Sequence, residues 1–180
     1  MRRNLVRLAL SACACLLAVL LAAHRPPAEI PTTVLLVRHA ERESDSADSP
    51  LSAAGLARSR ALVDVAADAG IGHIYTTEYR RTRETAAPIA AQVGVEPTIV
   101  PVGRGEVNAH AREVAQRVRA HTGEVVLVVG HSNTVPLIVE ALGGDPGPEI
   151  SEDEYDRLYI LTVPPSGRTR TIRARFGPAD

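Results

Sequence analysis

The chain has 180 residues, of which 45% are apolar, and its formal net charge at pH 7 is −1. This length allows one domain with a substantial core, and the near-neutral charge excludes the broad basic field typical of nucleic-acid-binding proteins. All 20 basic residues are arginines, so a Schiff-base lysine and a Walker A phosphate loop are also excluded. Any anion site must therefore be built locally from guanidinium groups and backbone amides.

Residues 1–23 have the pattern of an export signal. Arg2, Arg3 and Arg7 precede an almost unbroken apolar stretch from Leu8 to Ala23. A basic start, an apolar middle and small residues at the end are typical of a secretory signal peptide. An N-terminal membrane anchor is an alternative, although the stretch is shorter than the ~20 residues that span a bilayer. A lipoprotein signal around Cys13 and a buried helix of the domain are further alternatives.

We expect the domain itself at residues 32–180, after a proline-rich linker at residues 24–31. Basic residues ahead of the apolar stretch predict a cytoplasmic N-terminus and an exported domain. The domain would then be periplasmic, extracellular or anchored to the outer side of the cytoplasmic membrane. Both cysteines, Cys13 and Cys15, precede the domain, which therefore has neither a disulfide nor a thiolate metal site.

The first expected element of the domain is a strand. Residues 32–37 form a continuous apolar and β-branched run, which is typical of a strand buried on both faces. A polar loop follows to Pro50, and a helix is expected at residues 51–69, with Ser52 as its N-cap. Its predicted core positions are Leu56, Leu62 and Val63.

The remaining chain alternates between short apolar runs and helical patterns. Pro88 is expected to kink or break the second helix. Val114 and Val118 mark the apolar side of the third helix. In chain order the expected elements are a strand at 74–77, a helix at 81–93, a strand at 98–102, a helix at 111–121, a strand at 125–129, a helix at 134–142, and two closing strands at 158–163 and 169–175.

Strands that alternate with helices predict an α/β fold, a three-layer sandwich with a mostly parallel central sheet. Ligands of such folds bind beyond the carboxyl ends of the strands. Arg38 and His39 follow the first strand, Arg81 follows the second, and His131 follows the strand at 125–129. The topology therefore predicts that two arginines and two histidines converge at one edge of the sheet.

This set of side chains suits phosphate chemistry. Two guanidinium groups neutralise a phosphate dianion and match its geometry with paired donors. A neutral imidazole can attack phosphorus and form a phosphoenzyme, and a second histidine can stabilise charge on the phosphate oxygens. A carboxylic acid would protonate the leaving oxygen and later activate water.

Four segments carry motifs in a fixed order, namely residues 36–41 (LVRHAE), 51–55 (LSAAG), 75–86 (YTTEYRRTRETA) and 128–132 (VVGHS). They resemble the signatures of the histidine phosphatase superfamily, which has the phosphoglycerate mutase-like fold. Their order and spacing extend the resemblance from about Thr32 to the end of the chain. Two departures stand out, since Thr77-Glu78-Tyr79 replaces the usual Ser-Pro-Leu and Glu84 replaces Gln.

The resemblance implies a role for each matching residue. His39 would be the phosphorylated nucleophile, Arg38 and Arg81 would bind the phosphate, and His131 would complete the pocket. Arg81 rather than the adjacent Arg80 fits the distance to residues 85–86. The general acid has no clear match. Glu106 is the positional candidate, with Glu113 and Glu41 as alternatives.

The predicted function is hydrolysis of phosphate monoesters, with a phosphorylated small molecule or a phosphoprotein as substrate. Only about fifty residues separate Arg81 from His131, which leaves little material for the lid that a mutase needs. The alternatives are a phosphoglycerate mutase-type phosphotransferase and a non-catalytic phosphate-binding module. We expect no cofactor and no metal, because no His-x-x-x-His spacing is present and His73, His110 and His121 have the character of structural or surface residues.

Overall fold

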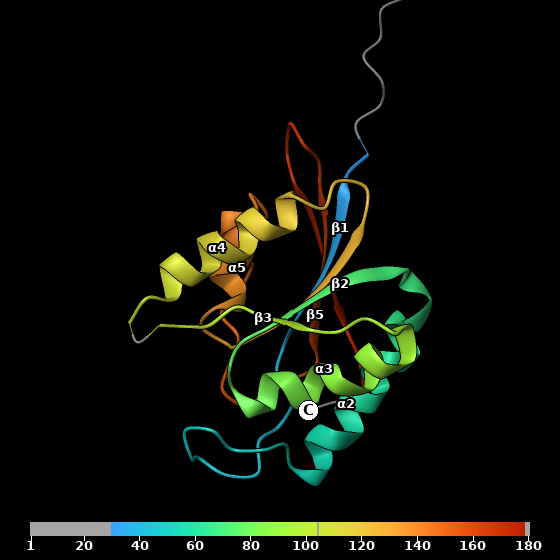
Figure 1. Cartoon of the computed structure of the whole chain (residues 1–180). Coiled ribbons are helices and arrows are strands. Elements are labelled where there is room, and N and C mark those ends of the chain that lie inside the picture. The colour runs from blue at the N-terminus through green and yellow to red at the C-terminus, as the bar shows by residue number, and fades with distance from the viewer. Residues whose placement is uncertain (1–29, 104, 179–180) are drawn as a thin grey trace, which may run out of the picture.

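A computed structural model of the chain describes residues 30–103 and 105–178. A six-stranded sheet of order β3-β2-β4-β1-β5-β6 forms its centre (Figure 1). The first four strands pair in parallel, and the last two run antiparallel to their neighbours. The strands are β1 (Thr32–Arg38), β2 (Ile71–Thr76), β3 (Thr98–Ile99), β4 (Val125–Gly130), β5 (Arg157–Val163) and β6 (Arg170–Arg175).

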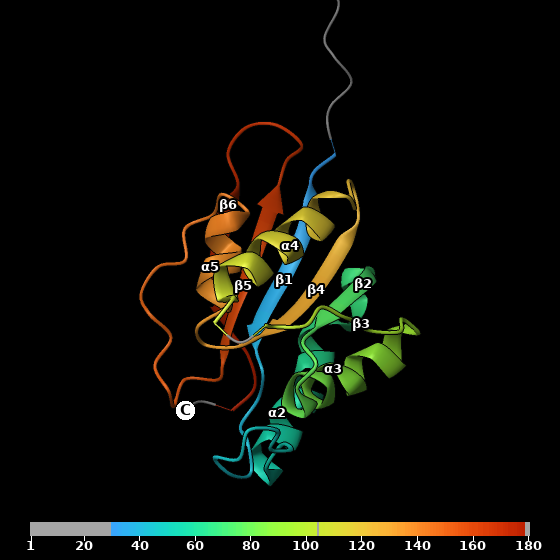
Figure 2. The same cartoon turned by 60° about the vertical axis from the view of Figure 1, so that its left-hand side comes forward.

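Helices cover both faces of the sheet, which confirms the three-layer α/β architecture (Figures 1 and 2). Helices α2 (Ala53–Ala66) and α3 (Arg80–Val93) pack together on one face, and the short 3-10 helix η1 (Ala67–Ala69) continues α2. Helices α4 (Val107–Arg119) and α5 (Val135–Ala141) pack on the other face.

The apolar run of β1 supplies both cores of the domain. Val34 and Leu36 lie in the core beneath α4 and α5, whereas Leu35 and Val37 lie in the core beneath α2 and α3. Successive side chains of a strand point to opposite faces. A strand with a helical layer on each side must therefore be apolar at every position, and this explains the unbroken pattern.

The expected export segment, residues 1–23, lies outside the described residues, as do residues 24–29 of the linker. Between residues 30 and 178, no described helix has the length and apolar character that crossing a bilayer requires.

The helices lie where the sequence patterns predict them, but the residue at which a helix starts is predicted less accurately. Ser52 caps α2, its hydroxyl accepting a hydrogen bond from the amide of Gly55 at 3.1 Å. Leu62 is fully buried, but Leu56 is 43% exposed, so its assignment to the core was wrong. Pro88 lies inside α3 and does not end it. Helix α4 starts at Val107, four residues earlier than expected.

Gly55 allows α2 to approach the loop that follows β1. A Cβ atom at this position would lie 2.2 Å from the carbonyl oxygen of Glu41, far inside van der Waals contact. The same carbonyl accepts a hydrogen bond from the amide of Ser52 at 2.9 Å. The Glu41 carboxylate also pairs with the buried Arg58 guanidinium at 2.8 Å. Helix α2 thus holds the backbone immediately after residues 38–40.

We expect Gly55→Ala to destabilise the fold by about 1–3 kcal/mol, because the added methyl must displace the Glu41 backbone. Urea unfolding of the full-length chain measures this change. Gly72→Ala is the matched control, since a Cβ atom there would meet no atom closer than 3.9 Å. Equal stability of the two variants would contradict the close approach.

Candidate active site

The carboxyl ends of β1 and β4 meet at one edge of the sheet. In their parallel register Arg38 lies opposite Gly130, and the amide of His39 donates to the Gly130 carbonyl at 2.9 Å. His39 and His131 therefore leave the sheet side by side. Their ring centroids are 5.3 Å apart, with an interplanar angle of 66°.

The imidazole of His39 is held in one tautomer. Its Nδ1 lies 2.8 Å from the carbonyl oxygen of Ala40, which can only accept a hydrogen bond, so Nδ1 carries the proton. The Nε2 lone pair is then available for reaction. Next along the chain, the Ala40 amide donates to the Thr85 hydroxyl of α3 at 2.9 Å, which holds this segment against the helix.

Burial keeps His39 neutral. The side chain is only 5% exposed, and desolvation lowers the pKa of His39 to about 3, with Arg81 and Arg38 contributing in the same direction. A neutral imidazole is the form that can act as a nucleophile. At neutral pH the site therefore presents a reactive nitrogen rather than a third cation.

His131 takes the opposite tautomer. A guanidinium group only donates, so the Arg81 Nη2 atom, 3.3 Å from His131 Nδ1, makes that nitrogen an acceptor. The proton then lies on Nε2, which donates to the Thr77 hydroxyl at 3.0 Å. Burial, followed by the neighbouring His39 and Arg81, lowers the pKa of His131 to about 2. Like His39, it is neutral.

Thr77 is a further residue of the site, and the sequence motifs had assigned it no role. It lies directly after β2, fully buried, and its hydroxyl bridges His131 and the hydroxyl of Thr82 at 2.9 Å. Thr77 stands where the resembling family usually has serine, so the hydroxyl persists despite the changed motif. A hydroxyl residue at the end of a strand was the feature of the sequence that could have indicated this role.

Arg38 is buried beneath the segment 151–155. Its Nη1 atom donates to the carbonyls of Ser151 at 2.8 Å and Glu154 at 2.9 Å, and its guanidinium lies 4.0 Å from the ring centre of Tyr155. Desolvation lowers the pKa of Arg38. No sequence motif indicated segment 151–155, because only the folded chain brings it over β1.

Arg81, not Arg80, faces the histidines. Arg81 donates from Nη1 to the Ala47 carbonyl at 2.8 Å, and its guanidinium lies 4.4 Å from the ring centre of Tyr79. Arg80 instead pairs with Glu84 along the outer side of α3. The spacing argument for Arg81 thus agrees with where the structure places it.

Both arginines retain an unused buried donor. Among the described residues, the Nε atoms of Arg38 and Arg81 have no hydrogen-bond partner. Buried polar atoms normally have partners, and orphaned ones mark places where a ligand or water completes the network. An oxyanion between the two guanidinium groups would supply the missing acceptors.

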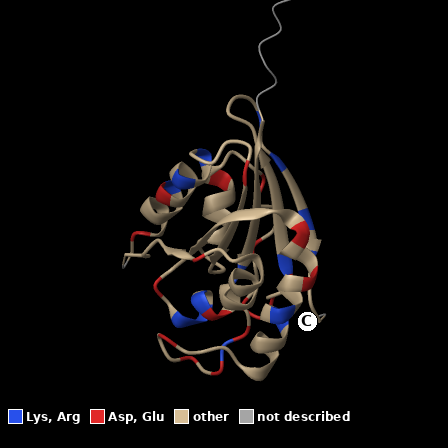
Figure 3. Cartoon of the chain, turned by 45° about the vertical axis from the view of Figure 1, so that its right-hand side comes forward, with Lys and Arg blue, Asp and Glu red and all other residues tan. Residues whose placement is uncertain are grey.

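These residues line a pocket of about 790 Å³. Its rim mixes charges: Arg42 pairs with Asp45 at 2.7 Å, and further carboxylates flank them. Basic and acidic positions are likewise interspersed on the loop after β1 at the lower edge of Figure 3. The pocket is lined by Arg38, His39, Arg42, Glu43, Ser44, Asp45, Arg81, His131, Ser132, Asn133, Glu152, Asp153 and Tyr155.

Glu106, the expected acid, does not line this pocket. Because α4 begins early, Glu106 occupies the N-cap position of that helix, beside Gly103. The alternatives are also engaged elsewhere, Glu41 with Arg58 and Glu113 with Arg117. The lining carboxylates are Glu43, Asp45, Glu152 and Asp153.

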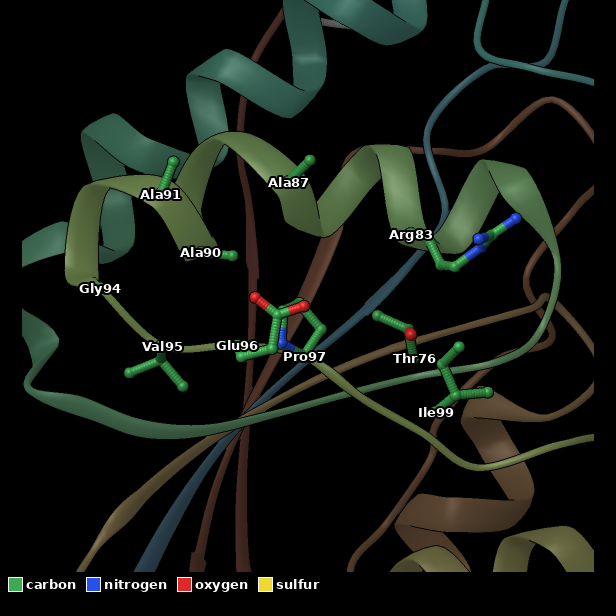
Figure 4. Close-up of a pocket in the computed structure, with 10 residues that line it drawn as sticks. All are labelled: Thr76, Arg83, Ala87, Ala90, Ala91, Gly94, Val95, Glu96, Pro97 and Ile99. Atoms are coloured by element: carbon green, nitrogen blue, oxygen red, sulfur yellow. The ribbon is translucent and has the colours of Figure 1, made fainter.

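A second hollow, of about 660 Å³, lies between α3 and β3 (Figure 4). It is lined mainly by small and apolar side chains, with Arg83 and Glu96 as its charged members and no histidine. It therefore lacks the combination of two histidines and two arginines found at the strand ends. Its lining residues are Thr76, Arg83, Ala87, Ala90, Ala91, Gly94, Val95, Glu96, Pro97 and Ile99.

Residues 34–102 match the model of the histidine phosphatase superfamily (branch 1). This match includes Arg38, His39 and Arg81 and ends before His131. The family match supports phosphatase or phosphotransferase activity in general terms. No curated protein sequence matches the chain.

Solved structures share the fold. A protein histidine phosphatase SixA complexed with tungstate is 18% identical, with a TM-score of 0.62, covering 79% of this chain and 96% of that one. A structure named as the phosphohistidine phosphatase SixA of Agrobacterium tumefaciens is 23% identical, with a TM-score of 0.59, covering 83% and 99%. A mycobacterial glucosyl-3-phosphoglycerate phosphatase is 14% identical, with a TM-score of 0.60, covering 83% and 100%. At these identities the likeness establishes the shared fold alone.

The buried neutral histidines predict acid lability. An unfolded imidazole has a pKa of about 6.5, whereas those of His39 and His131 are about 3 and about 2 in the folded protein. The unfolded state therefore binds more protons as the pH falls from 6.5 towards 3, and stability decreases across that window. Between pH 7.5 and 5.0 each histidine contributes a loss of about 2 kcal/mol.

We expect His131→Asn to remove about 2 kcal/mol of this pH-dependent loss, as measured by urea unfolding at pH 7.5 and 5.0 in phosphate-free buffer. An identical loss in wild type and variant would contradict the burial of a neutral imidazole at this position.

Proposed function

We propose that this member of the histidine phosphatase superfamily hydrolyses phosphate monoesters through a phosphohistidine intermediate on His39, without a metal ion. One observation carries the proposal. A buried, neutral imidazole is fixed by its Nδ1 contact with Ala40, beside two arginines whose Nε donors are orphaned. The arrangement combines a nucleophile with a ready-made binding site for a dianion.

In the first step, His39 Nε2 attacks phosphorus and the bond to the leaving oxygen breaks. Arg38 and Arg81 hold the phosphate oxygens through the donors that are unused in the free site. As the phosphate dianion draws the Arg81 guanidinium towards itself, His131 Nδ1 is released, takes up a proton from solvent and donates a hydrogen bond to a phosphate oxygen.

In the second step, water attacks the phosphohistidine and releases phosphate. A carboxyl group at the pocket must assist proton transfer in both steps. Asp45 is paired with Arg42, and the Ser151 hydroxyl lowers the pKa of Asp153 through a hydrogen bond, which favours its ionised form. Glu43 and Glu152 are the remaining lining carboxylates, and we assign them as the acid candidates in place of Glu106.

Hydrolysis is favoured over mutase activity because the chain has few residues that could form a lid. The segment between Arg81 and His131 consists of the rest of α3, β3, a connecting loop, α4 and β4, and its helices pack on the sheet. The described residues of this segment form no separate lid over the pocket, whose lining includes none of them. An intermediate in such a pocket is accessible to water, which favours release of inorganic phosphate.

A non-catalytic phosphate-binding module is the second candidate. It is favoured by the position of Glu106, which leaves the site without the acid expected from the sequence. The same arginines would then bind a phosphorylated ligand without turnover. The two functions differ in one measurable respect, the release of inorganic phosphate.

The full-length chain should hydrolyse p-nitrophenyl phosphate in the presence of a chelator. His39→Ala should lower kcat below detection, and Arg81→Ala should lower kcat/KM by about 100- to 1000-fold because it removes charge stabilisation of the phosphate. Arg80→Ala, on the outer side of α3, is the matched control and should retain activity. Rapid acid-free quenching should trap phosphate on Nε2 of His39.

The outcomes of these assays distinguish hydrolysis through His39 from phosphate binding without turnover. Phosphate binding by a folded protein without turnover of this ester or of other phosphate esters would favour the binding module. Activity that a chelator abolishes, or that survives His39→Ala, would contradict the histidine mechanism.

The acidic rim predicts a preference among leaving groups. Asp153 forms no ion pair with a cation of the described residues, so its carboxylate repels leaving groups that carry their own negative charge. We expect Asp153→Asn, which leaves both acid candidates in place, to raise kcat/KM for 3-phosphoglycerate about 2- to 5-fold relative to p-nitrophenyl phosphate, and the gain to shrink in high salt. An unchanged ratio would exclude an electrostatic role of this residue in selectivity.

A further inference from the structure

Two histidines and a glutamate meet at the end of the sheet opposite to the candidate active site. His73 lies on β2, and His121 and Glu124 lie on the turn between α4 and β4. The Nε2 atom of His73 is 2.5 Å from Oε2 of Glu124, and the Nδ1 atom of His121 is 3.4 Å from the same oxygen. One ligand atom from each residue lies within 4.8 Å of the others.

The two imidazole rings are stacked, with centroids 3.5 Å apart and an interplanar angle of 23°. Two protonated rings in this position would repel each other. Consistent with this, desolvation and the neighbouring His73 lower the pKa of His121. In the free site the Glu124 carboxylate accepts a hydrogen bond from Nε2 of His73, and a metal ion would displace that proton and contact both imidazoles and the carboxylate at a common point on the surface.

Tyr75 orients the second imidazole. Its hydroxyl lies 2.8 Å from Nε2 of His121, and its side chain is 7% exposed. When Nε2 donates to this hydroxyl, Nδ1 is left unprotonated on the side of Glu124. A ligating histidine typically has its other nitrogen held in this manner by a neighbouring group.

We propose that His73 Nε2, His121 Nδ1 and the Glu124 carboxylate bind a divalent transition metal ion, Zn²⁺ foremost, with water completing the coordination. Imidazole nitrogens and carboxylate oxygens are common zinc ligands. Tetrahedral zinc with bonds of about 2.0–2.1 Å requires ligand atoms about 3.4 Å apart. The contact of His121 with Glu124 already has that length, and the contact of His73 must widen by about 0.9 Å.

The exposed parts of the cluster can make this adjustment. The side chains of His73 and Glu124 are 37% and 51% exposed, so each can move without repacking the core. The sequence offered no indication of this cluster, because 47 residues lie between His73 and His121 and no local metal-binding spacing is present. The parallel pairing of β2 with β4 brings the ligands together.

The bound ion would have a structural role. The turn that carries two of the ligands also holds the start of β1: the Thr32 hydroxyl donates to the His121 carbonyl, and the Thr33 amide donates to the Glu124 carbonyl, each at 2.9 Å. A metal ion would join this turn to β2 and so connect the first residues of three neighbouring strands, β1, β2 and β4. The phosphate pocket lies beyond the opposite strand ends, so catalysis does not depend on the ion.

Zinc titration of the full-length chain by calorimetry tests the site. Cys13→Ser and Cys15→Ser are introduced throughout, to exclude binding by thiolates of the N-terminal segment. We expect one ion per chain, with affinity lowered more than about 100-fold by His73→Asn or Glu124→Gln and about 10-fold by Tyr75→Phe. Zinc at 100 times its Kd should raise the Tm by about 5–10 °C.

Two controls separate this site from others. Glu113→Gln removes a comparably exposed carboxylate of α4 and should leave zinc affinity unchanged. His39→Asn removes one of the paired pocket histidines and should also leave it unchanged. Zinc affinity that falls with His39→Asn but not with His73→Asn would overturn the proposal, as would the absence of zinc binding. Hydrolysis of p-nitrophenyl phosphate should be insensitive to zinc removal, so failure of either proposal is recognised independently.

Discussion

The parallel pairing of β1 with β4 is the constraint on which the candidate active site depends. It places Arg38 opposite Gly130, so the next residue of each strand, His39 and His131, leaves the sheet at the same level. A shift of one residue would turn every side chain of β1 to the other face. The register is secured because both strands are apolar at nearly every position and are covered on both sides.

This arrangement is energetically unfavourable in one respect, because it buries histidine and arginine side chains that have no anion to neutralise them. Desolvation lowers the pKa values of His39, His131, Arg38 and Arg81 together. A dianion in the pocket would reverse this penalty, because it supplies both charge and hydrogen-bond acceptors. The free site is thus electrostatically arranged for its ligand rather than for its own stability.

The surrounding contacts hold the segment that carries His39 in place. Thr85 binds the amide of Ala40, Ser52 and Gly55 hold the backbone of Glu41, and segment 151–155 covers Arg38. These contacts come from different helices and loops, each packed on the sheet. At the other end of the sheet, His73, His121 and Glu124 lie together near the first residues of β1, β2 and β4. The sheet therefore separates the candidate active site from the proposed metal site.

The sequence by itself determined the α/β class, the alternation of strands and helices, and the convergence of Arg38, His39, Arg81 and His131. These follow from local periodicity and from the rule that parallel strands present their carboxyl ends together. Only the tertiary structure decided the surroundings of that set. It placed Glu106 at a helix start, brought segment 151–155 over Arg38, left Leu56 exposed, and joined His73 to His121. These placements depend on where helices begin and on contacts between distant segments, which local sequence patterns do not encode.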